Sequence, residues 1–191
     1  MQFTAAIATA VLAFASSAVA APLEARQAAL ENWKVTGVAS NTPSGRPGSY
    51  PWATITASVT DPNEINLGPA KSDGTDVIVP AGSQGINCQA KWFTKGESPL
   101  GRTWPCDPVE GGYWTVTVLE GTNGFSTTDF KLKFNHVADV LYQGSKYTAS
   151  FTAEGSFKVG DNLAGQCGGS GVCGWGLAPG KNPVLITPTK L

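Results

Sequence analysis

The chain has 191 residues, of which 14% are charged, and its formal net charge at pH 7 is −1. This composition offers no electrostatic attraction to phosphate backbones or anionic lipid headgroups, and it therefore argues against nucleic-acid and membrane partners. The 23 glycines and 13 prolines, together with many Thr and Ser residues, favour strands and turns.

The beginning of the chain is typical of an exported protein. Residues 1–20 carry no ionisable side chain, contain an apolar run over residues 5–15, and end in Ala18-Val-Ala20, an A-x-A pattern that predicts cleavage before Ala21. A membrane anchor needs about 20 apolar residues, which this run does not reach. We therefore expect a signal peptide over 1–20, a candidate pro-segment over 21–26, and one secreted domain over 27–191.

The first predicted strands lie in the first half of the domain. Residues 33–38 form one strand, and a loop rich in Pro and Gly follows it. Residues 52–60 alternate apolar side chains with Thr and Ser, which is typical of a half-buried strand. Residues 64–75 are expected to form a loop, and 76–80 a short strand that ends at a proline.

Two further strands flank a turn-rich insert over residues 94–105. Residues 86–92 and 113–119 both alternate with a period of two, which indicates strands with one buried face. The side chains predicted to face the core are Ile86, Cys88, Ala90 and Trp92 in the first strand and Trp114, Val116 and Val118 in the second.

The last third of the domain continues this pattern. A hairpin turn is predicted at 121–124, strands at 130–136 and 147–153, and a connection over 137–144, with a last strand at 183–187. Seven or eight strands without a credible helix predict an all-β fold. We expect a single antiparallel β-barrel or β-sandwich.

Four cysteines behind an export signal predict two disulfides, for which three pairings exist. We favour bonds between neighbours, Cys88 with Cys106 and Cys167 with Cys173. The first bond would tie the insert to the sheet and is worth about 3 kcal/mol in the chain-entropy model. Zinc is the competing interpretation, but the C-x17-C and C-x5-C spacings are not those of zinc fingers, so we expect no metal.

The sequence shows no catalytic centre. Its only histidine, His136, falls on the buried side of its strand, and no G-x-S-x-G elbow accompanies it. Cysteine catalysis is excluded if all four thiols are paired. A carbohydrate hydrolase needs two acids facing each other across a cleft. Glu120 shares the buried side of its strand, but no partner acid is evident, and we expect neither catalytic residues nor a cofactor.

Six tryptophans are the remaining candidates for a binding site. Trp33, Trp92 and Trp114 lie within predicted strands, where they most simply fill the core. The other three lie at a strand entrance, in the first disulfide loop and after the second. They could serve as exposed partner-binding aromatics or pack under loops. These candidate residues are Trp52, Trp104 and Trp175.

Several short stretches carry a resemblance to a known family. They are the leader Met1-Gln-Phe-Thr4, the segment 21–27, the strand opening Trp33-x-Val35, and the arrangement of the four cysteines as one mid-chain pair and one late pair. In these features the chain resembles the Alternaria major allergen family of fungal secreted β-barrel proteins. The resemblance implies an antiparallel barrel without enzyme activity that acts as an effector, elicitor or allergen at the host surface.

One departure from that family concerns assembly. The family carries an additional early cysteine that joins two subunits, whereas no cysteine lies between Gln27 and Asn87 here, so we expect no covalent dimer.

Together these features predict a non-enzymatic secreted effector-like or elicitor protein. It would bind a host protein or a cell-wall glycan and induce plant cell death or defence. A cell-wall polysaccharide-binding module is the first alternative, and a carbohydrate hydrolase around Glu120 is the second.

Overall fold

The computed structural model describes residues 29–191, which contain thirteen strands and no helix. The prediction of an all-β fold is therefore confirmed. The predicted signal peptide and pro-segment lie outside the described residues.

The first sheet has six antiparallel strands in the order β10-β11-β1-β2-β5, with β12 also paired to β1. Its long central strands follow the alternation of apolar and polar side chains seen in the sequence. The strands of this sheet are β1 (Trp33–Thr42), β2 (Trp52–Asp61), β5 (Ser83–Phe93), β10 (Leu163–Cys167), β11 (Cys173–Leu177) and β12 (Val184–Ile186).

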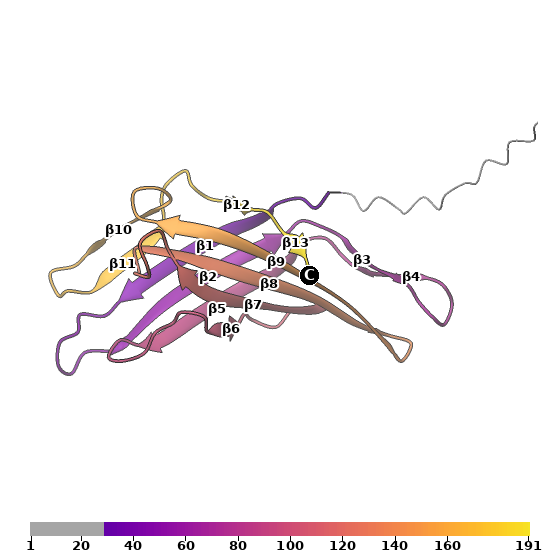
Figure 1. Ribbon diagram of the computed structural model, residues 1–191, viewed down its shortest axis with the longest axis horizontal. Coiled ribbons are helices and arrows are strands. Elements are labelled where there is room, and N and C mark those ends of the chain that lie inside the picture. The colour runs from indigo at the N-terminus through magenta and orange to yellow at the C-terminus, as the bar shows by residue number, and fades with distance from the viewer. Residues whose placement is uncertain (1–28) are drawn as a thin grey trace, which may run out of the picture.

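The second sheet has five antiparallel strands in the order β13-β9-β8-β7-β6. Its strands are β6 (Thr103–Pro105), β7 (Gly112–Glu120), β8 (Asp129–Tyr142), β9 (Ser145–Lys158) and β13 (Thr189–Lys190). A separate hairpin of β3 (Ile65–Pro69) and β4 (Asp76–Val79) extends beyond one end of the two sheets (Figure 1).

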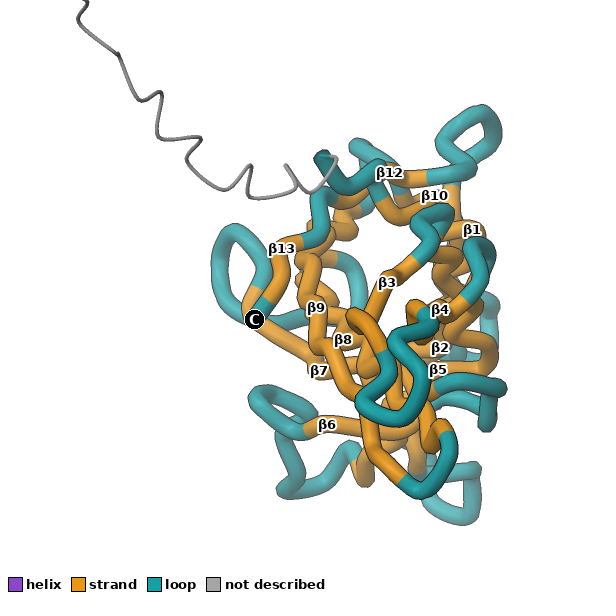
Figure 2. Tube along the Cα trace, turned by 90° about the vertical axis from the view of Figure 1, so that its right-hand side faces the viewer, coloured by secondary structure: helices purple, strands orange, loops and turns teal. Residues whose placement is uncertain are grey.

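The two larger sheets face each other as separate layers and do not close into one barrel (Figure 2). A barrel of seven or eight strands is therefore not confirmed. Between the layers, inward side chains of both sheets form one hydrophobic core. At its centre the rings of Trp33 from β1 and Trp114 from β7 meet edge to face, with centroids 4.8 Å apart.

Both expected disulfides are present, Cys88–Cys106 and Cys167–Cys173. The first joins a fully buried position of β5 to the chain that enters β7. The second closes the β10–β11 hairpin, where its two cysteines are direct cross-strand partners. The all-β fold and the neighbour pairing of the cysteines were thus both predicted from sequence.

Three local predictions were wrong. Ile86 is 43% exposed, because Asn87 takes a positive φ of 51° and the register between β2 and β5 shifts, so the chain upstream of Cys88 changes side. Residues 137–142 continue β8, since a two-residue turn at Gln143-Gly144 with positive φ joins it directly to β9. The expected loop at 64–75 contains β3.

Candidate functional site

The six tryptophans fall into two groups by burial. Trp33, Trp92 and Trp114 are 0%, 4% and 1% exposed and belong to the core. The three candidate partner-binding residues are all half-buried, and these are Trp52, Trp104 and Trp175.

The structure does not bring these three tryptophans together on one face. Trp104 lies opposite the buried Val116 and packs against the core, and the Arg102 guanidinium lies 5.2 Å from its ring centroid. Trp175 is the cross-strand partner of Ser40, a buried residue, so it lies on the inner side of the first sheet. Only Trp52 lies on the outer side, because its neighbour Ala53 points into the core.

Around Trp52 lies a cluster that we call the aromatic surface, formed by Tyr50, Trp52, Lys91 and Phe93. Trp52 and Phe93 are cross-strand partners on β2 and β5, and their ring centroids are 5.6 Å apart. Tyr50 is 60% exposed. The Lys91 ammonium lies 5.4 Å from the Tyr50 ring centroid and 5.3 Å from that of Trp52, within the range of cation–π attraction.

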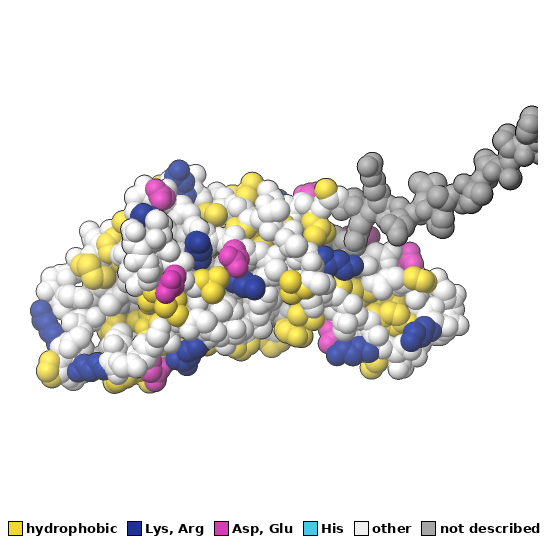
Figure 3. Space-filling view, viewed as in Figure 1, with side chains coloured by type: hydrophobic (Ala, Val, Ile, Leu, Met, Phe, Trp, Pro, Cys, Tyr) yellow, Lys and Arg dark blue, Asp and Glu magenta, His cyan; other side chains and the backbone are white. Residues whose placement is uncertain are grey.

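Backbone contacts fix the loop that presents this surface. The Thr94 amide and hydroxyl both donate to the Pro51 carbonyl, over 3.1 and 3.0 Å. Beside the surface lies a pocket of about 170 Å³ lined by the loop of residues 45–51 and by 93–95. In Figure 3 this end of the molecule, at the left, shows Lys and Arg side chains next to hydrophobic ones. Flat rings beside a cation can stack on a partner and bond to its polar groups.

Glu120, the acid considered for a hydrolase, does not lie where the sequence predicts. Glu120 is the last residue of β7 and its side chain is exposed, although the alternation of the strand predicted an inward position. The next residue, Gly121, forms an isolated bridge with Gly124, so the regular strand ends there. The prediction that Glu120 points inward was therefore wrong.

A second constellation, which sequence reasoning missed, lies between the two sheets. We call it the buried polar network, formed by Asp61, Ser83, Trp114 and His136. The distance from His136 Nδ1 to Asp61 Oδ2 is 3.0 Å, and from His136 Nε2 to Ser83 Oγ it is 3.1 Å. Trp114 Nε1 donates to Ser83 Oγ over 3.0 Å. His136 and Asp61 are each 1% exposed, and Ser83 is half-buried.

Four strands position this network. Asp61 ends β2 and is the cross-strand partner of Ser83 at the start of β5, while Trp114 of β7 is the partner of His136 in β8. The imidazole stacks on the Trp114 ring, with centroids 4.2 Å apart and planes 5° from parallel. Gly85 allows this packing, because a Cβ at that position would lie 3.0 Å from atoms of Trp114 and Val59.

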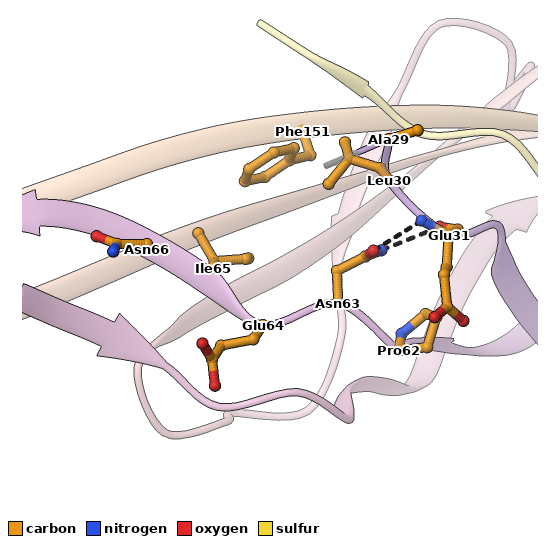
Figure 4. Close-up of a pocket in the computed structure, with 9 residues that line it drawn as sticks. All are labelled: Ala29, Leu30, Glu31, Pro62, Asn63, Glu64, Ile65, Asn66 and Phe151. Carbon is orange, nitrogen blue, oxygen red and sulfur yellow. Dashed lines mark hydrogen bonds between the residues drawn. The ribbon is translucent and has the colours of Figure 1, made fainter. Parts of the chain in front are cut away.

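The Asp61 carboxylate is held from its other side as well. Its Oδ1 accepts hydrogen bonds from the Asn63 amide, over 2.8 Å, and from Asn63 Nδ2, over 2.7 Å. Asn63 also accepts from the Glu31 amide and donates to the Glu31 carbonyl, as the dashed lines in Figure 4 show. A pocket of about 290 Å³ lies beside this clamp. The carboxylate is thus fixed in one orientation toward His136.

No family model matches the chain, and no curated protein or solved structure shows a match. Over residues 29–191 there is no group of three or more His, Cys, Asp and Glu side chains that could hold a metal ion. The same part of the chain has no helix that is long and apolar enough to cross a membrane. Function must therefore be argued from the two constellations.

Proposed function

We propose that this protein is a secreted, effector-like or elicitor protein that acts by contact with a host protein or a cell-wall component. The aromatic surface is the contact region. The proposal rests on two neighbouring rings, the exposed Tyr50 and the half-buried Trp52, with the Lys91 ammonium within 5.4 Å of both ring centroids. This function needs no reaction centre, cofactor or metal.

Three further features support the proposal. The leader, with its A-x-A pattern, and two disulfides suit an oxidising compartment outside the cell. The cysteine layout resembles that of the Alternaria major allergen family, whose members act on the host surface. Trp and Tyr are enriched among the residues that contribute most to binding at protein interfaces.

A cell-wall polysaccharide is the second candidate partner, and a specific observation favours it. Next to Trp52, the outer positions of β2 and β5 carry hydroxyl and amide side chains, and the Gln89 amide donates to the Thr56 hydroxyl over 3.3 Å. Rings that stack on a sugar face beside side chains that bond to hydroxyl groups form the arrangement that a carbohydrate platform needs.

Two experiments test these proposals. Purified protein infiltrated into leaves of several plant species is expected to induce cell death or defence responses, and Trp52→Ala to reduce the response. Pull-down on insoluble chitin, cellulose and β-glucan tests the polysaccharide alternative. Trp104→Ala serves as a matched control in both, since its ring lies against the core beneath Arg102. The absence of any response in all hosts, together with tight glycan retention, would replace the first proposal by the second.

A further inference from the structure

We propose that Ser83 is a nucleophile, with His136 as its general base and Asp61 as the positioning residue, and that the protein hydrolyses neutral esters of short apolar acids. The inference is independent of the contact function. Trp52 and Asp61 are the first and last residues of β2, so the two regions lie about 30 Å apart, at about 3.3 Å per strand residue.

The hydrogen-bond chemistry assigns each proton of the network. An ionised Asp61 can only accept, so a neutral His136 carries its proton on Nδ1 and leaves Nε2 as an acceptor. Trp114 Nε1 can only donate, so Ser83 Oγ accepts from it, and the serine's own proton can point to His136 Nε2. This is the protonation pattern that an Asp-His-Ser nucleophile requires.

The three residues of the proposed triad differ in burial. His136 and Asp61 are enclosed between the sheets, whereas Ser83 is half-buried. Because water is excluded from the Asp61–His136 pair, their electrostatic interaction is stronger than it would be at the surface. Of the three residues only Ser83 has partly exposed surface, so a substrate has to approach the network at this residue.

Ser83 also lines a pocket of about 230 Å³, which sets the class of substrate. Its apolar walls come from Ile86, Pro108 and Val109, and this space suits a short apolar acyl group. The pocket also includes Asp107, whose carboxylate accepts a hydrogen bond from Asn87 Nδ2 over 2.7 Å. A carboxylate at this position disfavours anionic substrates, so we infer a neutral ester.

The reaction has two balanced halves. In the first, Ser83 Oγ attacks the ester carbonyl carbon while its proton moves to His136 Nε2. The carbon–alkoxy bond then breaks, and the leaving alcohol takes that proton, which gives an acyl-serine. In the second, water attacks the acyl carbon and gives one proton to His136 Nε2. The acid leaves, and the proton returns to Ser83 Oγ.

Labelling of the folded full domain with an alkyl fluorophosphonate tests the nucleophile, with peptide mass spectrometry locating the adduct. We expect one adduct, on Ser83, together with hydrolysis of p-nitrophenyl butyrate. Ser83→Ala should lose both. Ser58→Ala should keep both, because Ser58 is another half-buried serine, on the neighbouring β2. If the folded wild-type protein is not labelled on Ser83, the proposal is wrong whatever the variants show.

Asp61→Asn tests the positioning role. A folded variant should keep KM for p-nitrophenyl butyrate within about twofold and lose about a hundredfold or more in kcat, because the imidazole would no longer be held in the required tautomer. A purely structural network predicts a different outcome. In that case Asp61→Asn would lower the melting temperature and leave an already negligible hydrolysis rate unchanged.

Discussion

The aromatic surface and the buried polar network are built from similar parts in opposite environments. At one end of β2 the Trp52 ring lies beside the Lys91 ammonium and is partly exposed to solvent. At the other end the Trp114 ring lies beside the His136 imidazole and both are enclosed. In each case an aromatic ring contacts a nitrogen-bearing side chain on a neighbouring strand.

The two regions differ in their exposure to solvent. Buried polar groups that lose a partner keep their desolvation cost, so the network should contribute strongly to stability. When a side chain next to an exposed ring is removed, water can cover the surface that it leaves. The aromatic surface should therefore contribute little to stability while remaining available to a partner.

His136→Ala should give the largest effect. The variant leaves the buried Asp61 carboxylate without its imidazole partner and opens a cavity against Trp114, so we expect a loss of about 3–5 kcal/mol in the free energy of unfolding. Urea titration followed by tryptophan fluorescence measures it. Lys131→Ala, a change at an outward position of the same strand, is the control and should stay within about 0.5 kcal/mol. A loss below about 1 kcal/mol for His136→Ala would contradict the contrast.

Removal of the buried disulfide should destabilise the protein more than removal of the exposed one. Replacing Cys88 and Cys106 together by Ala opens a loop with a sequence separation of 18, worth about 3 kcal/mol in the chain-entropy model, and changes a fully buried position. Replacing Cys167 and Cys173 opens a separation of 6 in an exposed hairpin, worth about 2 kcal/mol. Thermal melts of the two double variants compare the two losses of stability. An equal or larger loss from the second pair would count against the ranking.

Trp52→Ala should lower stability by only about 1–2 kcal/mol, because the half-buried ring loses one aromatic contact with Phe93 and a small buried area. Trp92 on β5 is the matched control, because it pairs with Ala53, the residue next to Trp52, and is only 4% exposed. Trp92→Ala should lower the free energy of unfolding by about 3–5 kcal/mol. Chemical denaturation of both variants measures the difference. Similar losses would mean that Trp52 is a core residue in practice.

The smallest effect is expected at Asp73, an exposed carboxylate that joins the β3–β4 hairpin to the β8–β9 turn. The Thr75 backbone amide, first, and then the Tyr142 hydroxyl and Gln143 amide lower the pKa of Asp73 below its ordinary value of 3.8. Because the folded pKa is depressed, this contribution is fully present above 3.8 and is lost as pH falls through the folded pKa.

Amide exchange of Thr75 between pH 5 and pH 2 checks this prediction. We expect its protection to decrease only at the acid end, and Asp73→Asn to weaken the protection at pH 5 and to make it independent of pH. A pH-independent protection in the wild-type protein would show that the carboxylate does not hold the hairpin.

Much of the fold was predictable because period-two alternation reports directly on sheet faces. Residues 52–60 alternate without interruption and form β2 almost as expected. The prediction was wrong where backbone conformation, rather than side-chain pattern, decides the outcome. The positive φ of Asn87 moves Ile86 to the outer side, and Gln143 adopts a positive φ that lets β8 run directly into β9. Asn and Gly at such positions are only weak signals in a single sequence.

The candidate sites were predictable in part. The burial of three tryptophans followed from their places in strands, but the pairing of Trp52 with Phe93 depends on a strand register that the sequence does not show. The association of Asp61, Ser83 and His136 could not be predicted, since they are brought together by pairing between distant strands and by the stacking of two sheets. Gly82 and Gly85 around Ser83 were the only local signal, and they lie just before and within the start of strand β5, with no helix following.

We propose that the aromatic surface makes contact with a partner without contributing much to stability. Adsorption isotherms of wild-type protein and Trp52→Ala on isolated plant cell walls test it most directly, since such walls contain both glycans and wall proteins. We predict retention of the wild-type protein and an affinity at least about tenfold lower for a Trp52→Ala variant that melts at nearly the same temperature. Equal retention of the two folded proteins would contradict the claim.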